Sequence, residues 1–324
     1  MNNIDNKMKA AILEKFGGPK ELLIQNISIP EIGVNEILIK VEYAGIGQWD
    51  IFEREGGYAQ MLGIKPKFPY VLGSEGAGTI YAIGKEVSGF NVGDKVYAPG
   101  FLNSKGGFYA EYVTIDSKYV LCIPGCITTQ EASVISGVGI TALRGLEDIL
   151  KIKQGESVLI FGASGGVGHL AVQLAKNIGA KVFAVASGED GVDMIRKFGA
   201  DVVVNGRKDD ILLSARSFAP EGFDAILLTS GDEMVETVIK CVRPGGRIAY
   251  PKGIYPEPKV QSGIRLIGYN GDPDPEIIQR LNKYINSCNL RVHIDKMFLL
   301  EDACNAHLSL NKHYLGKLCL QVSY

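Results

Sequence analysis

The apolar positions of the chain follow two different patterns, one before and one after Thr128. Residues 8–125 contain short β-branched or apolar runs separated by glycine, proline and aspartate turns, as at Gly17-Gly18-Pro19. This pattern predicts a compact antiparallel β-domain, a partly closed barrel. After Thr128, helical spacing alternates with strand-like runs, which is typical of a doubly wound parallel sheet with helices on both faces. The strand-like runs are 158–161, 182–186, 202–204, 224–229 and 246–250, and we expect an edge strand at 264–269.

The first strand of this parallel sheet leads into a glycine-rich turn and then a helix. The run Val158–Phe161 is followed by Gly162-Ala163-Ser164-Gly165-Gly166-Val167-Gly168, and helical spacing continues to residue 179. Such a turn lets backbone N–H groups and the positive end of a helix meet a pyrophosphate. A glycine-rich turn with only a structural role is the alternative. We expect a dinucleotide to contact Ala163, Ser164, Gly165, Gly166 and Val167.

Two later strands of the sheet end in residues of the same expected site. Thr229 and Ser230 end or follow the fourth strand, and Tyr250 and Gly253 end or follow the fifth. Ligands of open α/β sheets bind at the carboxyl ends of the strands. These four residues are therefore expected to line the dinucleotide site.

Composition and charge narrow the classes of function. The 324 residues suit two domains, and 34 basic against 36 acidic residues, a net charge of −2, give no reason to expect nucleic acid or a membrane surface as a partner. No apolar run is long enough to span a bilayer, and the polar stretch Met1–Lys7 lacks the apolar core of a secretion signal. The cysteines form no C-x-x-C pair, and we expect His307 and His313 at the surface. A soluble, cytoplasmic protein with reduced thiols is expected.

Several short motifs occur in order along the chain. They are Met8-Lys9-Ala10, Val71-Leu72-Gly73-Ser74-Glu75-Gly76-Ala77-Gly78, Val92-Gly93-Asp94-Lys95-Val96, Gly107-x-Tyr109-Ala110-Glu111-Tyr112, Gly139-x-Thr141-Ala142-Leu143, the glycine-rich turn and Gly316-Lys317-Leu318. Together they resemble the medium-chain dehydrogenase/reductase superfamily, specifically its zinc-independent quinone oxidoreductase branch. The resemblance implies a GroES-like β-barrel catalytic domain at 1–127, a Rossmann domain at 128–269, and a return to the catalytic domain at 270–324, with a cofactor cleft between the domains. It also implies a homodimer, which could form through the edge strand 264–269.

The resemblance defines where a catalytic zinc would be bound. The zinc-dependent alcohol dehydrogenases carry cysteine, histidine and cysteine where this chain has Gly47, Ser74 and, near Gly137, no cysteine. Zn²⁺ needs thiolate or imidazole ligands, and Glu75 alone cannot hold it. The four-cysteine structural zinc lobe is also missing. We therefore expect a protein without zinc.

The missing zinc ligands favour one class of reaction. Zinc stabilises the localised charge of an alkoxide. Hydride transfer to the β-carbon of an enone or quinone instead leaves a delocalised enolate, which a hydrogen-bond donor can stabilise. We expect reduction of a quinone, enone or enal. A carbonyl or alcohol oxidoreductase of the same fold is the first alternative, and a non-catalytic NADP(H)-binding sensor or structural protein is the second.

The resemblance also implies residues of the substrate site. Related quinone reductases place two tyrosines near the nicotinamide, and this chain has Phe52 at the first position and Tyr58 at the second. Tyr58 is the candidate for donating a hydrogen bond or proton to the carbonyl, with an aromatic wall or loop anchor as the alternative. Gly47, Trp49 and Phe52 are expected in the substrate pocket, although Trp49 could equally be a core residue. Thr141 matches a nicotinamide contact, and a helix N-cap is the alternative.

The end of the second parallel strand bears on the choice of cofactor. An NAD-preferring site usually has Asp or Glu there, whereas this chain has Ala186 followed by Ser187. Without a carboxylate, a 2′-phosphate is not repelled, and Ser187 and Arg207 could bind it. Arg207 could also be a solvated loop charge. The departures from related NADPH-dependent enzymes are Gly191 and Gly206, which replace a lysine and a tyrosine, and the nearby acids Glu189 and Asp190. We expect NADPH, with NADH as the alternative.

Overall fold

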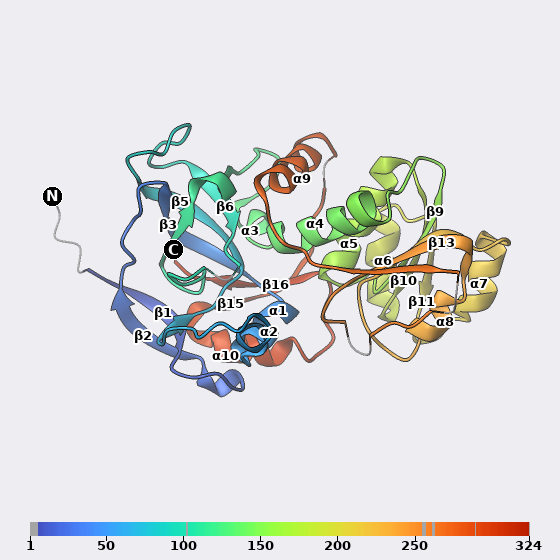
Figure 1. The fold of residues 1–324 in the computed structure, drawn as a ribbon, viewed down its shortest axis with the longest axis horizontal. Helices are drawn as coiled ribbons and strands as arrows, with labels where there is room; N and C mark the ends of the chain where they lie inside the picture. Colours follow the sequence, from blue (N-terminus) through green and yellow to red (C-terminus); the bar gives the residue numbers. More distant parts are fainter. Residues whose placement is uncertain (1–5, 102, 255–256, 261–262, 289, 324) are drawn as a thin grey trace. The chain divides into compact units, whose positions relative to one another are not determined.

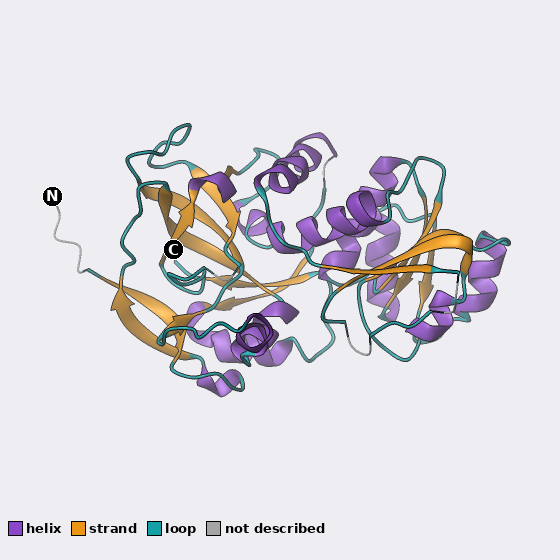
Figure 2. Cartoon of the chain, viewed as in Figure 1, coloured by secondary structure: helices purple, strands orange, loops and turns teal. Residues whose placement is uncertain are grey.

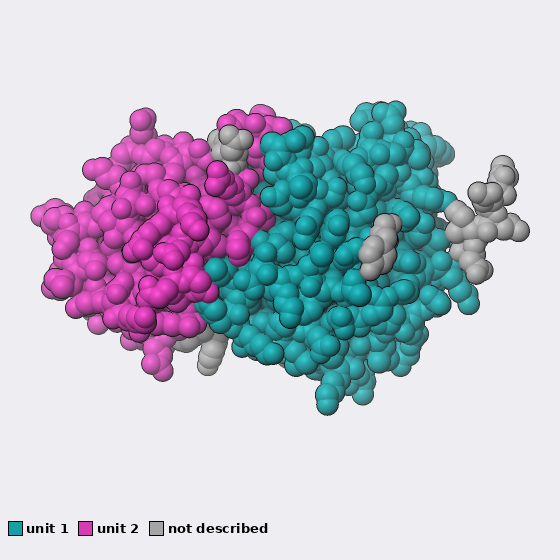
Figure 3. All heavy atoms as spheres, turned by 180° about the vertical axis from the view of Figure 1, so that it is seen from behind, with its two compact units in different colours: residues 1–137, 273–282, 294–324 teal, residues 138–272, 283–293 magenta. Residues whose placement is uncertain are grey.

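The chain folds into two compact units, drawn in teal and magenta in Figure 3. The computed structural model describes residues 6–101, 103–254, 257–260, 263–288 and 290–323. Unit 1 comprises Met1–Gly137, Pro273–Asn282 and Ile294–Tyr324, and unit 2 comprises Val138–Asp272 and Lys283–His293. Most of the polar extension expected at Met1–Lys7, residues 1–5, lies outside the described residues.

Unit 1 is organised around β3 (Glu36–Ile46), which pairs antiparallel with β5 (Glu75–Ile83), β7 (Tyr112–Asp116) and β16 (Lys317–Gln321). β16 brings the end of the chain beside its beginning, as the red and blue strands of Figure 1 show. The larger sheet has the order β15-β16-β3-β5-β6-β8 with β7 on β3, and the smaller has the order β2-β1-β4. The other strands are β1 (Lys7–Leu13), β2 (Leu23–Ser28), β4 (Tyr70–Val71), β6 (Lys95–Pro99), β8 (Leu121–Cys122) and β15 (Ile294–Leu299).

The core of unit 1 is formed by the apolar runs that predicted its strands. Ile12, Ile37, Val41 and Phe108 are fully buried in one cluster. All strand pairs are antiparallel except β15 with β16. The predicted β-domain is thus confirmed. Its helices are α1 (Gln48–Arg54), α2 (Gly57–Leu62), α3 (Thr129–Ala132) and α10 (Ala303–Ser309).

Unit 2 contains a six-stranded parallel sheet with the order β11-β10-β9-β12-β13-β14. Helices lie on both of its faces (Figure 2), so the predicted doubly wound sheet is confirmed. The strands are β9 (Ser157–Phe161), β10 (Lys181–Ala186), β11 (Val202–Asn205), β12 (Phe223–Leu228), β13 (Val242–Pro251) and β14 (Arg265–Tyr269), and the helices include α5 (Gly166–Ile178), α6 (Gly188–Lys197), α7 (Ile211–Phe218) and α8 (Val235–Ile239). The strand order reverses between β9 and β12, which places the carboxyl end of β9 at the switch point of the sheet.

The helix that contains Thr141, predicted as its N-cap or as a nicotinamide contact, begins before this residue and changes its geometry along its length. It starts at Ser136 as α4 (Ser136–Leu143) and continues as a π-helix (Arg144–Ile149), in which the Leu150 N–H bonds to the Gly145 carbonyl. A Cβ on Gly145 would lie 2.4 Å from the Tyr269 hydroxyl, so tight packing accompanies the wider turn. Helix α9 (Pro275–Cys288) follows later in the chain. Within the described residues, no helix is both long and apolar enough to cross a bilayer.

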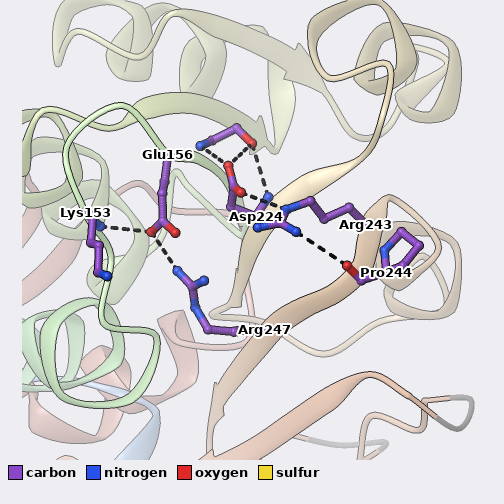
Figure 4. A network of polar contacts seen from close by, with 7 residues as sticks. Lys153, Glu156, Asp224, Arg243, Pro244 and Arg247 are labelled. Atoms are coloured by element: carbon purple, nitrogen blue, oxygen red, sulfur yellow. Dashed lines mark hydrogen bonds and ion pairs between the residues drawn. The ribbon is translucent and has the colours of Figure 1, made fainter.

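Charged side chains join the amino ends of three strands in unit 2 (Figure 4). The Asp224 carboxylate accepts hydrogen bonds from the Ser157 N–H at 2.8 Å and from Arg243 Nε at 2.8 Å. Glu156 accepts bonds from the Lys153 N–H at 2.9 Å and from Arg247 Nη2 at 2.6 Å. These contacts join β9, β12 and β13 at their amino ends, whereas the glycine-rich turn follows the carboxyl end of β9.

Candidate functional site

Three glycines shape the turn between β9 and α5. Gly162 has a φ of +78°, which favours glycine, and a Cβ on Gly168 would lie only 2.2 Å from the Gly162 carbonyl oxygen. Gly165 is the N-cap of α5, and no side chain caps this 13-residue helix. The first backbone N–H groups of α5 therefore lack a side-chain acceptor at the positive helix end. These residues fit the pyrophosphate of a dinucleotide.

The residues around this turn are joined to one another. The Ser187 N–H, after β10, donates to the Ser164 hydroxyl at 3.1 Å, and the Ala163 N–H donates to the Val185 carbonyl at 2.9 Å. The Thr229 hydroxyl, after β12, donates to the Phe161 carbonyl at 2.7 Å. The predicted site residues of three strand ends are thus brought together at the switch point.

Gly162 is held from the side of β12 as well. A Cβ at this position would lie 2.6 Å from the Ser230 hydroxyl and 2.7 Å from the Thr229 hydroxyl. The Thr229 hydroxyl also lies within hydrogen-bond distance of the Gly162 carbonyl, at 3.0 Å. Both side chains brace the turn, a structural role that position at a strand end did not reveal.

Tyr250 and Gly253, the predicted site residues of β13, make contacts of a different kind from those of Thr229 and Ser230. The Tyr250 side chain is buried, and its hydroxyl donates to the Glu257 carboxylate. Burial and then this contact raise the pKa of Tyr250 to about 12. Gly253 has a φ of +100°, which favours glycine at a turn.

The loop after β11 contains a cation that the sequence interpretation missed. Lys208 Nζ pairs with the Glu189 carboxylate at 2.9 Å, and the Asn205 amide donates to the same carboxylate at 3.1 Å. The Lys208 and Asn205 contacts lower the pKa of Glu189. Arg207, the predicted phosphate ligand, is exposed on this loop, and its N–H bonds to the Asn205 side chain at 3.1 Å. One of the two acids that weakened the NADPH prediction, Glu189, is thus paired with a neighbouring lysine.

Thr141 lies inside α4 and is buried. Its carbonyl accepts a hydrogen bond from the Tyr269 hydroxyl at 2.9 Å, and a Cβ on Gly271 would lie 2.2 Å from its Oγ1. The alternative of a helix N-cap is therefore wrong, because α4 begins five residues earlier, at Ser136.

In unit 1, the candidate Tyr58 belongs to a group of four aromatic rings. Its ring centroid lies 4.6 Å from that of Phe52, 5.8 Å from that of Trp49 and 5.0 Å from that of Phe101. Tyr58 is buried, whereas Phe52 is exposed at the rim of the group. Phe101 comes from the loop after β6 and was not predicted, since no spacing in the sequence links it to α1 or α2.

A buried ion pair lies beside Gly47, the first position at which a zinc enzyme would have a ligand. Lys317 Nζ donates to Glu75 Oε1 at 2.7 Å, and the two side chains are 4% and 3% exposed. A Cβ on Gly47 would lie 3.2 Å from the Lys317 nitrogen. The second Glu75 oxygen accepts bonds from the Gly137 N–H at 2.8 Å and the Ser136 hydroxyl at 3.1 Å. Burial alone would lower the pKa of Lys317, but the neighbouring carboxylates raise it, so the group is an ammonium.

Ser74, at the second of these positions, is near Asp50. Asp50 is fully buried, and it accepts hydrogen bonds from the Gly47 N–H at 2.7 Å, the Ser74 hydroxyl at 3.4 Å and the Tyr109 hydroxyl. Burial raises the pKa of Asp50 to about 6, although the Gly47 N–H and Lys317 oppose this shift. Among the described residues, no three histidine, cysteine, aspartate or glutamate side chains are grouped to hold a metal ion. The donors around Lys317 therefore do not fit zinc.

The polar chain continues from Asp50 to His307, which is fully buried, so its expected surface location is wrong. Arg54 can only donate, so the His307 Nδ1 atom, 2.9 Å from its Nη1, accepts. The His307 Nε2–H then faces the Tyr109 oxygen at 3.3 Å, which leaves the Tyr109 proton for Asp50. Burial and then Arg54 lower the pKa of His307 to about 3, so it is neutral. The buried stripe Ala303, Ala306 and His307 on α10 has helical spacing, which is the signal that could have found it.

A third buried carboxyl group, that of Glu53, lies on α1. The Tyr70 hydroxyl donates to it, and burial raises the pKa of Glu53 to about 7 even though this hydrogen bond opposes the shift. The Asp50 carboxylate contributes to raising it. Unit 1 thus holds two carboxyl groups that ionise near neutral pH rather than in acid.

Comparisons with known proteins agree with this architecture. Residues 33–125 match the family model of the alcohol dehydrogenase GroES-like domain, and residues 166–261 match that of zinc-binding dehydrogenases. The chain is 30% identical over 315 residues to a quinone oxidoreductase of Lama guanicoe, covering 94% of this chain and 93% of that protein. It is 31% identical over 295 residues to an alcohol dehydrogenase of Geobacillus stearothermophilus, covering 81% and 84%. A mycobacterial protein solved in complex with NADPH has a TM-score of 0.84 at 26% identity, covering 97% of this chain and 100% of its own.

Proposed function

Because the chain belongs to the medium-chain dehydrogenase/reductase superfamily of oxidoreductases, we propose that it is a zinc-independent reductase of quinones or α,β-unsaturated carbonyls that uses NADPH. The observation that carries this proposal is the buried ammonium of Lys317, which lies beside Gly47 and pairs with Glu75. A thiolate and an imidazole at Gly47 and Ser74 would be needed to bind zinc there.

The reaction follows from what such a site can stabilise. Reduction at the β-carbon of a conjugated carbonyl leaves its negative charge delocalised, so neutral donors suffice. An alkoxide formed from a simple alcohol concentrates the charge on one oxygen and benefits most from a Lewis acid. The similarity to an alcohol dehydrogenase keeps simple carbonyls among the substrates to be tested.

The nicotinamide cofactor, when bound, supplies the hydride. The N–H groups of Gly166 and Val167 at the start of α5 would hold its pyrophosphate, beside Ser164. Ala186 offers no carboxylate to the ribose, and Glu189 is paired with Lys208. Both features support NADPH over NADH, because a 2′-phosphate carries nearly two negative charges.

Tyr58 is the group that we propose as donor to the substrate oxygen. Its ring is fixed by Trp49, Phe52 and Phe101, which supports an ordered hydroxyl position. A positioned general acid contributes about 10²–10⁴-fold to a rate. Tyr58→Phe keeps the aromatic packing, so it should lower kcat about a hundredfold. An unchanged kcat would reduce Tyr58 to a packing residue.

We also propose a homodimer paired through β14. This strand is at one end of the six-stranded sheet, and its outer backbone groups need partners. Multi-angle light scattering should give twice the chain mass of 35.0 kDa, and a mass of one chain at micromolar concentration would contradict this.

The activity is tested by oxidation of NADPH and of NADH with a panel of quinones, enals, enones and simple ketones. Turnover should be fastest with NADPH and a conjugated acceptor, and it should survive exhaustive dialysis against a zinc chelator. Turnover with ketones or alcohols alone, or activity lost on chelation and regained with zinc, would overturn the proposal. Tight NADPH binding without turnover of any acceptor would instead favour the sensor.

A further inference from the structure

Four large apolar side chains are exposed within eight residues at the end of α2. Met61, Leu62, Ile64 and Phe68 have exposed fractions of 61%, 50%, 48% and 38%. The described residues contain fifteen exposed large hydrophobic side chains altogether, so these four form the densest group. Together with Lys65 and Lys67 they are called the α2 ridge below. Grouped exposed apolar side chains often mark an interaction surface, whereas single exposed apolar side chains are common and need no explanation.

The α2 ridge is bounded at both ends by residues that fix its position. The apolar stripe of α2 begins with Tyr58, which is buried among aromatic rings. It continues at helical spacing to Met61 and Leu62, whose side chains are exposed. Gly63, with a φ of +65°, ends the helix. At the far end, the Phe68 ring packs edge-on against Phe16 at 5.3 Å. The stripe thus lacks the apolar partner that would complete it.

The charge on the ridge identifies the partner. Lys65 and Lys67 are exposed, and neither forms an ion pair within the described part of the chain. The segment 56–74 contains no Asp or Glu, so it has a local charge of +2 in a chain of net charge −2. Apolar side chains that protrude between lysines fit the headgroup and acyl boundary of a bilayer containing anionic lipid.

We propose that the α2 ridge docks this protein reversibly on anionic lipid surfaces. The four exposed apolar side chains lie within eight residues, and apolar side chains can insert into fluid lipid without needing a shaped receptor. The overall balance of charge gave no reason to expect a membrane surface, because it does not reveal this local excess of positive charge. Docking itself is independent of the proposed function. Docking would also bring the aromatic rings around Tyr58 close to acceptors dissolved in the bilayer, and this advantage rests on the proposed function.

Flotation with phosphatidylcholine vesicles, with and without phosphatidylserine, tests the docking. The wild-type protein should float with the anionic vesicles, and low salt should strengthen the binding. Leu62→Glu/Ile64→Glu should weaken it at least tenfold, and Lys65→Gln/Lys67→Gln should weaken it roughly 25-fold, since each lysine contributes about fivefold. Trp49, the only tryptophan, lies 5.8 Å from Tyr58, so its fluorescence provides a second readout of binding.

Matched controls come from exposed apolar residues elsewhere. Val92→Glu in unit 1 and Leu213→Glu in unit 2, at positions 63% and 66% exposed, should leave vesicle binding unchanged. Equal loss in ridge and control variants, or no flotation of the wild-type protein, would overturn the proposal. A ridge variant that changed the oligomeric mass instead would show that the ridge contacts a second copy, which also overturns it. These measurements need no acceptor, so failure of the docking is separate from failure of the reductase activity.

Discussion

The glycine-rich turn of unit 2 and the Lys317–Glu75 pair of unit 1 form their sites by opposite means. The turn depends on missing side chains, because Gly162 adopts a positive φ and Gly168 packs against a carbonyl. The pair depends on two charged side chains that are almost fully buried. One site leaves backbone donors free for a ligand, and the other satisfies its charges internally.

The difference teaches where each site is vulnerable. A turn built from glycines tolerates changes that point into open space and fails where a Cβ meets backbone. A buried pair tolerates the removal of both charges better than the removal of one, because the remaining charge lacks a partner. Four predictions test the two units, in order of decreasing expected effect.

The largest effect is expected for Lys317→Met. It leaves the Glu75 carboxylate buried without its cation, and breaking such a pair costs about 3–5 kcal/mol of unfolding free energy. Adding Glu75→Gln should recover most of the lost unfolding free energy, because no unpaired charge then remains buried. Urea denaturation of both variants measures the effect, with Lys85→Met at an exposed position as the control. If the double variant were as unstable as the single one, packing rather than charge would dominate the site.

Glu53→Gln should stabilise the protein at alkaline pH. The pKa of Glu53 is raised from 4.5 to about 7 in the folded state, so the folded state binds more protons than the unfolded state between these values. Its contribution to stability is therefore present below about pH 4.5 and is lost as the pH rises to 7. A glutamine does not ionise, so the variant avoids this loss. Its unfolding free energy should exceed that of the wild-type protein by up to about 3 kcal/mol at pH 8 and by nothing at pH 4. Unfolding free energies at the two pH values test it, with the exposed Glu86→Gln as the control, and an equal gain at both would contradict the titration.

Two glycine substitutions separate packing from ligand access in the turn. A Cβ at position 168 would lie 2.2 Å from the Gly162 oxygen, so Gly168→Ala should cost about 1–3 kcal/mol of stability. At position 165 the nearest atom is at 3.4 Å, so Gly165→Ala should leave stability unchanged and weaken cofactor binding. Thermal unfolding and NADPH fluorescence titration measure the two effects. Loss of stability in both variants would mean that the turn is only a structural element.

The smallest effect is expected for Arg207→Ala. The side chain is exposed, so its contact with a 2′-phosphate would be screened by solvent. The preference for NADPH over NADH should fall roughly tenfold or less, about 1 kcal/mol. Ratios of kcat/KM for the two cofactors measure this, with Arg196→Ala on α6 as the control. An undiminished preference would assign phosphate binding to other residues, with Lys208 the first to test.

The fold could be predicted from the sequence because its signals are local. Strand–turn–helix order around Gly162–Gly168 and the run of β-branched segments before Thr128 each depend on neighbours within a few residues. The start of α4 was missed because Ser136 and Gly137 have weak helix propensity, and the Glu75 carboxylate that bonds to them is sixty-odd residues away. His307 was misplaced for a similar reason, since its partners Arg54 and Tyr109 come from other elements.

The sequence by itself determined the two kinds of sheet and the turn that fits a dinucleotide, since both depend on residue types at fixed spacing. Through the resemblance to zinc-dependent enzymes, it also showed that thiolate and imidazole are missing at the zinc positions. Only the tertiary structure decided that Lys317 stands beside Gly47, that Asp50 is linked to Tyr109, and that Phe101 joins the rings around Tyr58. The physical reason is that burial and pairing of charges depend on contacts between strands and helices far apart in the chain. No local propensity specifies such contacts.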